Sequence, residues 1–308
     1  MLLVTGATGY LGRSLCPALL QHGSSLRCLS RAAPAEEGVE WLPYDLADAS
    51  YAFQRTFDDV THVIHCAGVS HRQAPDNEYT ALNVAATRRL AEAAGRAGVG
   101  HFIYVSSLNV VPAAAEDPLL PARLLPAPEE AYARSKWQTE RELETICVQY
   151  GIALTVVRSA LMYDTELTAN LAIFASIMRW WPLSFPEVGQ RCLIGRPDVV
   201  RLLMACAEDA AGAPVGQPVV VASDGGCYSA LAISRAVAGR RVSGATAHLR
   251  TPEWLCYLGG RLLDWKGARA PGTAWQLLSA THWSGVHPQI TGWRPELRLE
   301  SALLREPL

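Results

Sequence analysis

The first dozen residues constrain this chain more than any other stretch. The apolar run Leu2–Val4 leads into glycines at positions 6, 9 and 12, after which an apolar pattern of helical period resumes. This order predicts a strand, a tight turn and a helix. Gly6 permits a sharp turn, Gly9 lets phosphate oxygens approach the backbone, and Gly12 lets the helix pack on its strand. The free N–H groups of such a helix face an anion, so the segment predicts a dinucleotide site, although similar glycines also occur in ordinary turns.

Composition narrows the class of protein. Half of the 308 residues are apolar, so the chain can bury a large core. The net charge is −2 and there is no long basic run, which argues against a nucleic-acid partner. The apolar run near Trp180 is broken by Arg179 and Pro182 and is too short to span a bilayer. No basic segment precedes the apolar N-terminus, so we expect neither a signal peptide nor membrane association.

The cysteines are scattered rather than paired. None forms a C-x-x-C motif, and most lie in apolar segments, at positions 16, 28, 66, 147, 192, 206, 227 and 256. This pattern favours buried, reduced thiols over a disulfide framework or a zinc site. We therefore expect a cytoplasmic protein without a metal centre.

Strand and helix patterns alternate through about residue 160. After the first turn, strands are predicted at 26–30, 39–44, 61–66, 101–106 and 153–158, with helices over 11–22, 77–98 and 129–149. This alternation predicts an α/β fold with a doubly wound parallel sheet. Further on, the alternation is less regular, with helices expected over 169–181 and 197–208 and a strand at 219–222.

Two strand ends carry residues suited to a cofactor. Arg31 follows the second strand, where a dinucleotide fold places its ribose-recognition residue. An arginine there could pair with the 2′-phosphate of NADP, so we expect NADP to be preferred over NAD; the alternative is a solvated surface arginine. Cys66, Ala67 and Gly68 end the fourth strand with small side chains, which suits a ligand crossing the sheet edge but also plain packing.

A tyrosine and a lysine are placed to share one site. Tyr132 and Lys136 lie four residues apart on a predicted helix, and hence on one face of it. The lysine cation, together with the positive nicotinamide of an oxidised cofactor, would lower the pKa of the phenol and make it a better proton carrier. A Y-x-x-x-K pattern alone is common by chance. Here it follows Ser107, whose hydroxyl, just past a strand, could bond the same substrate oxygen.

Four segments together resemble the extended short-chain dehydrogenase/reductases, the NAD(P)-dependent epimerase/dehydratase group. They are Thr5–Gly12, Asn83–Thr87, Tyr104–Ser107 and Tyr132–Lys136. The resemblance implies that Tyr132 is the catalytic acid/base, that Lys136 holds the nicotinamide ribose, and that Ser107 orients the reacting oxygen. It places Asp45 and Leu46 beside the adenine and has Asn83 support the active-site helix. The implied cofactor contacts beyond the catalytic helix are Gly6, Thr8, Gly9, Tyr10, Leu11, Gly12, Arg31, Asp45, Leu46, Cys66, Ala67, Gly68 and Asn83.

Within that group, three segments look like those of nucleotide-sugar 4-epimerases and 4-ketoreductases. Arg191–Val199 is similar to a segment whose first arginine meets the nucleotide diphosphate, Ala169–Leu171 to an Asn-Leu substrate segment, and Gly292–Pro295 to a closing Gly-Trp-x-Pro. The resemblance implies a nucleotide-linked sugar as substrate. The implied substrate contacts are Ser107, Asn109, Asn170 and Arg191.

The chain also departs from that pattern. Arg158-Ser159 stands where Arg-Pro is usual, and Tyr163-Asp164 stands where Tyr-Gly is usual. No second diphosphate arginine is evident in the C-terminal region. An ion pair with Asp198 is the alternative explanation of Arg191.

The resemblance implies a Rossmann-type domain and a smaller lobe. We expect an NAD(P)-binding domain with the catalytic residues at 1–165 and a mainly substrate-binding lobe at 166–308, of which about 190–225 returns to the first domain. The proline-rich loop 112–128 is expected to be a lid. The tryptophans at 254, 265, 275, 283 and 293 are expected to form the core of the lobe, or else a stacking surface. A homodimer through the helices over 77–98 and 129–149 is also implied.

Three classes of function remain open. The favoured one is NAD(P)-dependent redox chemistry on a nucleotide-linked sugar, by a 4-ketoreductase that consumes NADPH or a 4-epimerase that recycles NAD, with Arg31 favouring the reductase. The second is a reductase or dehydrogenase of an apolar, steroid- or flavonoid-like alcohol or ketone, which the tryptophan-rich C-terminal region could accommodate. The third is a catalytically silent cofactor-sensing or scaffold protein, against which the intact tyrosine and lysine argue.

Overall fold

The chain folds into two compact units. The computed structural model describes residues 1–70, 75–112, 115, 117–164, 185–208, 219–239, 251–266, 275, 279, 293–299 and 301. The first unit comprises Met1–Ser159, Arg196–Ala222 and Pro288–Arg294, and the second comprises Ala160–Gly195, Ser223–His287 and Pro295–Leu308. The chain thus passes from the first unit to the second after Ser159 and re-enters the first at Arg196. That the second unit binds the substrate stays a prediction.

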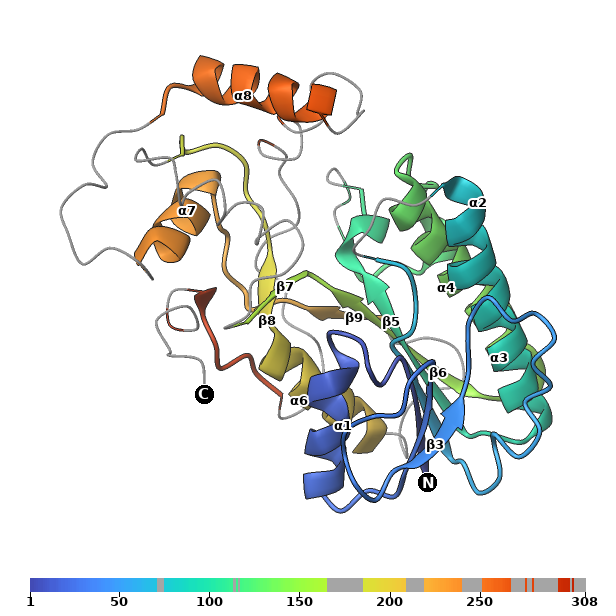
Figure 1. The fold of residues 1–308 in the computed structure, drawn as a ribbon. Helices are drawn as coiled ribbons and strands as arrows, with labels where there is room; N and C mark the ends of the chain where they lie inside the picture. Colours follow the sequence, from blue (N-terminus) through green and yellow to red (C-terminus); the bar gives the residue numbers. More distant parts are fainter. Residues whose placement is uncertain are drawn as a thin grey trace. The chain divides into compact units, whose positions relative to one another are not determined.

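A seven-stranded parallel sheet forms the centre of the first unit (Figure 1). Its strands are β1 (Leu2–Thr5), β2 (Leu26–Ser30), β3 (Glu40–Pro43), β4 (His62–His65), β5 (His101–Ser107), β6 (Ala153–Ser159) and β9 (Val219–Ala222). They run in the order β3-β2-β1-β4-β5-β6-β9, with every neighbouring pair parallel. β2, β5 and β6 are buried along their whole length, as expected for strands covered on both faces. The predicted Rossmann-type doubly wound sheet is confirmed.

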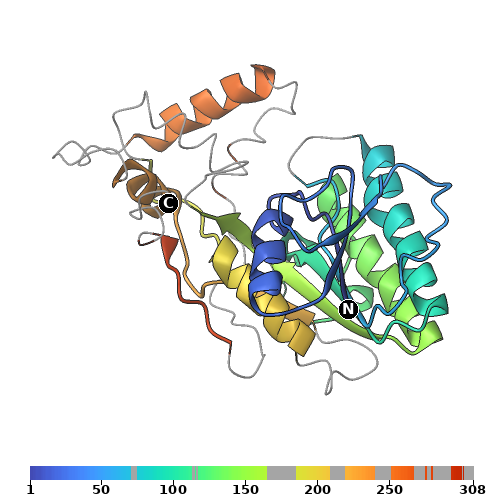
Figure 2. The same ribbon diagram turned by 60° about the horizontal axis from the view of Figure 1, so that its bottom comes forward.

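Helices cover both faces of this sheet. α1 (Gly12–Gln21) lies beside α6 (Arg196–Glu208), and α3 (Ala86–Arg96) lies beside α4 (Ala131–Tyr150) (Figures 1 and 2). The predicted bounds of α1, α4 and α6 are correct to within two residues. The helix expected over 169–181 lies outside the described residues. In the described part of the chain, no helix combines the length and the apolar character needed to cross a membrane.

The helix predicted over 77–98 is divided. α2 (Asp76–Tyr79) continues into a π-helical segment, η1 (Thr80–Ala85), and only then into α3. A π-helical turn holds an extra residue and is frequent at functional sites. Asn83, which the resemblance places beside the catalytic helix, lies within this turn and is buried.

The crossing from β3 to β4 has no helix. Instead, Phe53, Arg55 and Asp59 take left-handed φ angles of 51°, 59° and 58°, which cost non-glycine residues about 1–3 kcal/mol each. The buried Arg27 holds the segment, because its Nη1 donates to the carbonyl oxygens of Thr56 (3.0 Å) and Asp58 (2.7 Å). These hydrogen bonds from Arg27 therefore help to hold the strained backbone of this segment in place.

The second half of the proline-rich loop is hydrogen-bonded to the first unit, and its role as a lid stays a prediction. The buried Arg158 guanidinium donates to the carbonyl oxygens of Pro118 (2.7 Å) and Leu120 (2.8 Å). The indole of Trp137 on α4 donates to those of Ala122 (2.8 Å) and Leu125 (3.2 Å). Because these donors come from β6 and α4, hydrogen bonds attach residues 118–125 to the central sheet and to one of its helices.

The second unit has a core of its own. β7 (Leu161–Tyr163) and β8 (Leu193–Gly195) form a parallel pair, and α7 (Ala230–Gly239) contributes Ile233 to the same cluster. The fully buried Asp224 carboxylate accepts hydrogen bonds from the hydroxyls of Tyr163 (2.9 Å) and Tyr228 (2.7 Å). Burial raises the pKa of Asp224, which these hydrogen bonds oppose.

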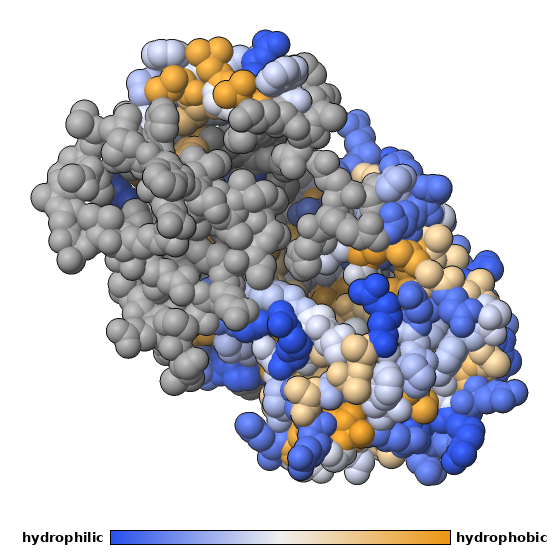
Figure 3. All heavy atoms as spheres, in the orientation of Figure 1, coloured by the Kyte–Doolittle hydropathy of each residue, from blue (hydrophilic) through white to orange (hydrophobic). Residues whose placement is uncertain are grey.

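The tryptophans do not form the predicted lobe core as a group. On α8 (Glu253–Lys266), Trp254 is 63% exposed and Trp265 is 78% exposed, within an apolar surface that includes Leu258 and Leu262 (orange over α8 in Figure 3). Trp293 is buried, but in the first unit, where its indole donates to the carbonyl oxygen of Asp198. Trp283 lies outside the described residues. All eight cysteines are free thiols, and five of them are buried.

Candidate active site

The glycine turn after β1 leaves no room for a side chain at Gly6 or at Gly12. Gly6 has a φ of +70°, and a Cβ on it would lie 2.8 Å from the backbone nitrogen of Ala67. A Cβ on Gly12 would lie 2.6 Å from the Cα of Ala7. Thr8 and Gly9, between them, are exposed. The turn therefore presents bare, accessible backbone at the N-terminus of α1, the arrangement that binds a pyrophosphate.

The other predicted cofactor residues lie at the same edge of the sheet, because β1 to β5 are parallel and their carboxyl ends coincide. Arg31 directly follows β2 and is exposed. Asp45 follows β3, is exposed, and accepts a hydrogen bond from the N–H of Ala47 (3.0 Å), while Leu46 is half-buried. Of this set, Arg31 and Asp45 have side chains open to a ligand.

Asn83 connects the loop after β4 to α4. Its Oδ1 accepts from the N–H of Val69 (2.8 Å), and its Nδ2 donates to Val69 O (3.1 Å) and to Ser135 Oγ on α4 (3.0 Å). Gly68 fits under this amide, because a Cβ there would lie 3.0 Å from Asn83 Oδ1 and 3.6 Å from Lys136 Nζ. The loop after Cys66 and Ala67 is thus held against the helix that carries Lys136.

Lys136 is a buried cation. Its side chain is 5% exposed, its Nζ donates to Val105 O (3.0 Å), and it lies 4.8 Å from the centre of the Tyr104 ring. Burial lowers the pKa of Lys136 to about 8, while the charges of Cys66 and Glu140 oppose this shift. The chain has only two lysines among its 27 basic residues, so this ammonium stands out in an arginine-rich protein.

Tyr132 lies in the first turn of α4, where Glu130 caps the helix by accepting from the N–H groups of Tyr132 and Ala133. Its side chain is half-buried. Burial raises the pKa of Tyr132 to about 12, and a hydrogen bond with Ser107 opposes this shift. The expected lowering of this pKa by the lysine is therefore not seen in the protein alone, because desolvation dominates and the ammonium is engaged by Val105.

Ser107 ends β5 and is buried. Its Oγ accepts a hydrogen bond from the N–H of Asn109 (3.2 Å) and so caps a short 3-10 turn, η2 (Leu108–Val110). The side chain of Asn109 is exposed. The structure thus brings Ser107, Tyr132 and Lys136 together on β5 and α4.

A buried ion pair between α4 and β6, near Ser107, Tyr132 and Lys136, was not predicted from the sequence. Glu140 and Arg158 are both fully buried, with Glu140 Oε2 2.6 Å from Arg158 Nη2 and Glu140 Oε1 accepting from Ser106 Oγ at 2.5 Å. Ser106 and Arg158 face each other across β5 and β6. The available signal was Glu140 itself, a charged residue four positions after Lys136 on the buried face of the helix.

His65 is a second residue that the sequence reasoning missed. It is fully buried at the end of β4, with Nδ1 2.6 Å from Thr5 Oγ1 and Nε2 2.7 Å from Thr87 Oγ1. Burial lowers the pKa of His65 to about 3, so the ring is neutral at physiological pH. The ring joins β4 to the end of β1, where the glycine turn begins, and to α3.

Arg191 lies in the second unit, where its backbone pairs with that of Tyr228. Its Nη2 is buried and has no hydrogen-bond acceptor among the residues that the structure describes, and burial lowers the pKa of the guanidinium. Asp198, the alternative partner, forms its ion pair with Arg201 on the same helix. Asn170 lies outside the described residues.

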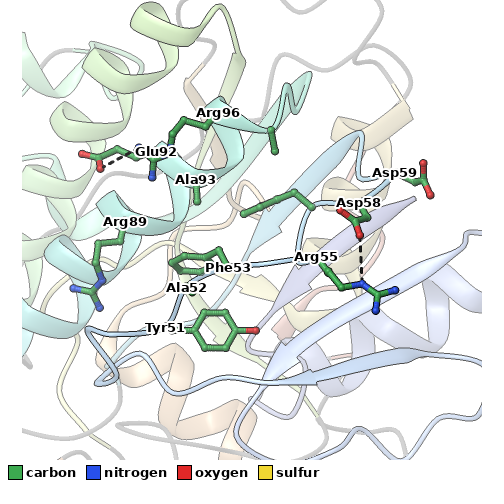
Figure 4. A pocket seen from close by; sticks show the side chains of 12 residues that line it. Tyr51, Ala52, Phe53, Arg55, Asp58, Asp59, Arg89, Glu92, Ala93 and Arg96 are labelled. Atoms are coloured by element: carbon green, nitrogen blue, oxygen red, sulfur yellow. Dashed lines mark ion pairs between the residues drawn. The ribbon is translucent and has the colours of Figure 1, made fainter.

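A groove of about 730 Å³ lies elsewhere in the first unit, between the 51–59 segment and α3 (Figure 4). Tyr51 and Phe53 line it, and four of its charged side chains form two ion pairs, Arg55 with Asp58 at 3.7 Å and Arg96 with Glu92 at 3.9 Å. None of the predicted site residues lines this groove, so it is separate from the candidate active site.

Comparison with known proteins shows the family to which this chain belongs. The profile of the NAD dependent epimerase/dehydratase family matches residues 2–172. The chain belongs to this family. A UDP-glucose 4-epimerase of Vibrio cholerae is 27% identical over 322 aligned residues, which cover 97% of this chain and 92% of that protein. A 3β-hydroxysteroid dehydrogenase/Δ5→4-isomerase of Mycobacterium tuberculosis is 34% identical over 119 residues, which cover 35% of this chain and 32% of that protein.

Solved structures share the fold of this protein over nearly the whole chain. MoeE5 in complex with UDP-glucuronic acid and NAD is similar with a TM-score of 0.75 and 21% identity, covering 98% of this chain and 96% of that one. The UDP-glucose 4-epimerase of Thermus thermophilus in complex with NAD has a TM-score of 0.73, 21% identity and the same coverage. These identities are low, so the likeness is one of fold.

The residues present fit the dinucleotide that the family implies. The exposed Gly9 carries no side chain where the pyrophosphate would approach the turn, and Lys136 supplies a buried ammonium where the nicotinamide ribose would lie. Sugar and phosphate oxygens are acceptors that both groups can bond.

Proposed function

We propose that this protein is an NAD(P)-dependent enzyme that oxidises and reduces a carbon of a nucleotide-linked sugar, as a 4-epimerase or a 4-ketoreductase. The observation that carries the proposal is the set of Ser107, Tyr132 and Lys136 assembled beside the glycine turn, in a family member that aligns with a UDP-glucose 4-epimerase over 97% of its length.

Each residue of the set has a distinct role in this proposal. The cofactor supplies or accepts a hydride when bound. Tyr132 donates a proton to the sugar oxygen, or removes it, and Ser107 shares the hydrogen bond to that oxygen. Lys136 holds the nicotinamide ribose. When its ammonium releases the Val105 carbonyl, the positive charge beside the Tyr132 phenol favours the phenolate. In the protein alone, the pKa of Tyr132 at about 12 keeps the phenol protonated and ready to act as an acid.

Arg191 supports a nucleotide diphosphate as part of the substrate. A buried guanidinium nitrogen without an acceptor among the described residues is costly, and an anion would satisfy it. Asn109, exposed beyond Ser107, and Asn170 are proposed as further substrate contacts. If Arg191 meets the diphosphate, UDP at 100 times its dissociation constant should stabilise the protein by about 2.7 kcal/mol, and Arg191→Met should abolish this effect.

The proposed cofactor is NADP in preference to NAD. The exposed Arg31 at the end of β2 supports this choice, because a guanidinium can pair with a 2′-phosphate and no carboxylate replaces it at that position. The structural neighbours named above were solved with NAD, so the choice is open to a direct test.

One assay distinguishes the functions. The protein is incubated with each cofactor and a panel of UDP-, GDP- and dTDP-sugars and their 4-keto derivatives, and both NADPH absorbance and product sugar are measured. Epimer formation without net NADPH consumption indicates an epimerase, and stoichiometric NADPH loss indicates a ketoreductase. Turnover of a steroid or flavonoid ketone alone would instead favour the second function, which the shorter match to the hydroxysteroid dehydrogenase supports. Tight cofactor binding without turnover of any substrate would indicate a sensing or scaffold protein.

Two further properties are proposed from the family resemblance. A homodimer would pack α3 and α4 against their copies, and the exposed Val148 on α4 is an apolar contact available to it. Sedimentation as a monomer at micromolar concentration would contradict the dimer. Free thiols in the core are consistent with a reducing compartment such as the cytoplasm.

A further inference from the structure

Arg196 reaches the glycine turn from far along the chain. It is the first residue of α6, which packs beside α1, the helix that follows the turn (Figures 1 and 2). Both helices belong to the first compact unit. Within Arg191–Val199, only Arg191 had a predicted role, so nothing in the sequence pattern singled out Arg196.

The guanidinium of Arg196 contacts Tyr10 in two ways. Its Nη1 donates to the backbone carbonyl oxygen of Tyr10 at 3.1 Å, and its Cζ lies 4.5 Å from the centre of the Tyr10 ring. A planar guanidinium can stack on a ring and donate in its own plane at once, which an ammonium cannot. Tyr10 lies between Gly9 and Gly12, in the middle of the predicted pyrophosphate turn.

The Tyr10 carbonyl lies just before the regular part of α1, which spans Gly12–Gln21. In a regular α-helix its donor would be the N–H of Ser14, but that N–H donates to Leu11 O at 3.1 Å. The neighbouring carbonyl of Gly9 is bonded within the turn, by the N–H of Arg13 at 3.0 Å. The peptide between Tyr10 and Leu11 is therefore held from outside α1.

The orientation of that peptide decides where one anion-binding N–H points. In a planar trans peptide, the carbonyl of Tyr10 and the N–H of Leu11 point in opposite directions. A donor that holds the carbonyl on one side thus fixes the direction of the Leu11 N–H on the other. A cationic donor also polarises the peptide, which makes that N–H a stronger hydrogen-bond donor.

We infer that Arg196 is a positioning residue for the dinucleotide: by holding the Tyr10 carbonyl, it directs the N–H of Leu11 toward the cofactor's pyrophosphate. The N–H groups at the start of a helix are the ones that meet such an anion. This inference rests on the proposed function, since it requires that a dinucleotide binds at the glycine turn.

The test is cofactor affinity without any sugar, measured by NADH and NADPH fluorescence titration. Arg196→Met should raise the dissociation constant by about tenfold, the effect of one charge-assisted hydrogen bond. Arg196→Lys should fall between Met and the unaltered protein, because it keeps the charge but cannot both stack and donate. Arg96→Met is the matched control, since it removes an equal charge from an exposed position in the last turn of α3, outside the glycine turn, and should change affinity by less than about twofold.

A second measurement separates positioning from a general loss of structure. In the cofactor-free Arg196→Met protein, hydrogen exchange should quicken in the peptide containing residues 10–14, while the melting temperature stays near that of the unaltered protein. With saturating cofactor, kcat should be retained and only the KM for the cofactor should rise.

The outcomes distinguish this inference from the function on which it rests. If the unaltered protein binds neither NAD(H) nor NADP(H), the proposed function fails. If it binds them and Arg196→Met binds equally well, or if Arg96→Met loses as much affinity as Arg196→Met, the positioning role of Arg196 is wrong and the proposed function is untouched.

Discussion

Replacing Lys136 by methionine should stabilise the cofactor-free protein at neutral pH. Burial lowers the pKa of this lysine from 10.5 to about 8, which corresponds to about 3 kcal/mol. Between pH 8 and 10.5 the folded state binds fewer protons than the unfolded state, so stability rises with pH across that window. Below pH 8 the buried ammonium therefore destabilises the fold by the full amount.

The net gain is smaller than this figure. Methionine cannot donate to Val105 O, and the loss of a hydrogen bond costs about 1 kcal/mol. We expect Lys136→Met to raise the free energy of unfolding by about 2 kcal/mol at pH 7, with the gain shrinking through pH 8 and disappearing by about pH 10. The same variant should bind NADH poorly, because the ammonium that would hold the ribose is gone.

Urea unfolding between pH 6.5 and 9.5 measures this gain, and Lys266→Met, which removes the only other lysine, is the control. Because the chain has just these two lysines, a protein labelled with ¹³C at lysine Cε gives two signals, and the titration of Lys136 can be followed directly. If Lys136→Met were less stable at pH 7, if its gain did not change with pH, or if the Lys136 signal titrated at the ordinary 10.5, the reasoning from desolvation would be refuted.

Three further changes test other parts of the site. Tyr132→Phe keeps the ring but removes the proton donor, so turnover should fall by about 10²- to 10⁴-fold with NADH affinity unchanged; a loss of under about threefold, with chemistry rate-limiting, would assign the proton to another group. Arg31→Asp should reverse a preference for NADPH over NADH of about tenfold or more in fluorescence titrations, whereas equal affinities in the unaltered protein would mean that Arg31 only meets solvent. Arg158→Met leaves the buried Glu140 without its partner and should cost about 3–5 kcal/mol in urea unfolding. The double change with Glu140→Leu should restore the part due to the unpaired carboxylate but not the part due to the lost hydrogen bonds to Pro118 and Leu120, and an undiminished loss in the double variant would mean that the unpaired carboxylate is not the cause.

Residues close together in the sequence were sufficient to predict the strands and helices on which the candidate site is built. Glycine is required at positions 6 and 12 because a Cβ there would lie too close to the backbone of Ala67 or of Ala7. The order of strand, turn and helix around them follows from residues that are neighbours in the sequence. The four-residue spacing of Tyr132 and Lys136 fixes their shared helical face without reference to the rest of the chain. For these reasons the parallel sheet, the glycine turn and the helix that carries Tyr132 and Lys136 could be predicted from the sequence, while their roles in cofactor binding and catalysis stay predictions.

The long-range contacts of the candidate site could not be predicted from the sequence. Arg196 meets Tyr10 across 186 positions, Glu140 meets Arg158 only because α4 packs over β5 and β6, and neither pairing has a periodicity to reveal it. The pKa of Lys136 follows from burial, which spacing does not report, and the lysine bonds Val105 O rather than lowering the pKa of Tyr132. Short-range hydrogen bonding and side-chain volume are properties of the sequence, whereas desolvation and long-range pairing exist only once the sheet and its helices have brought distant residues together.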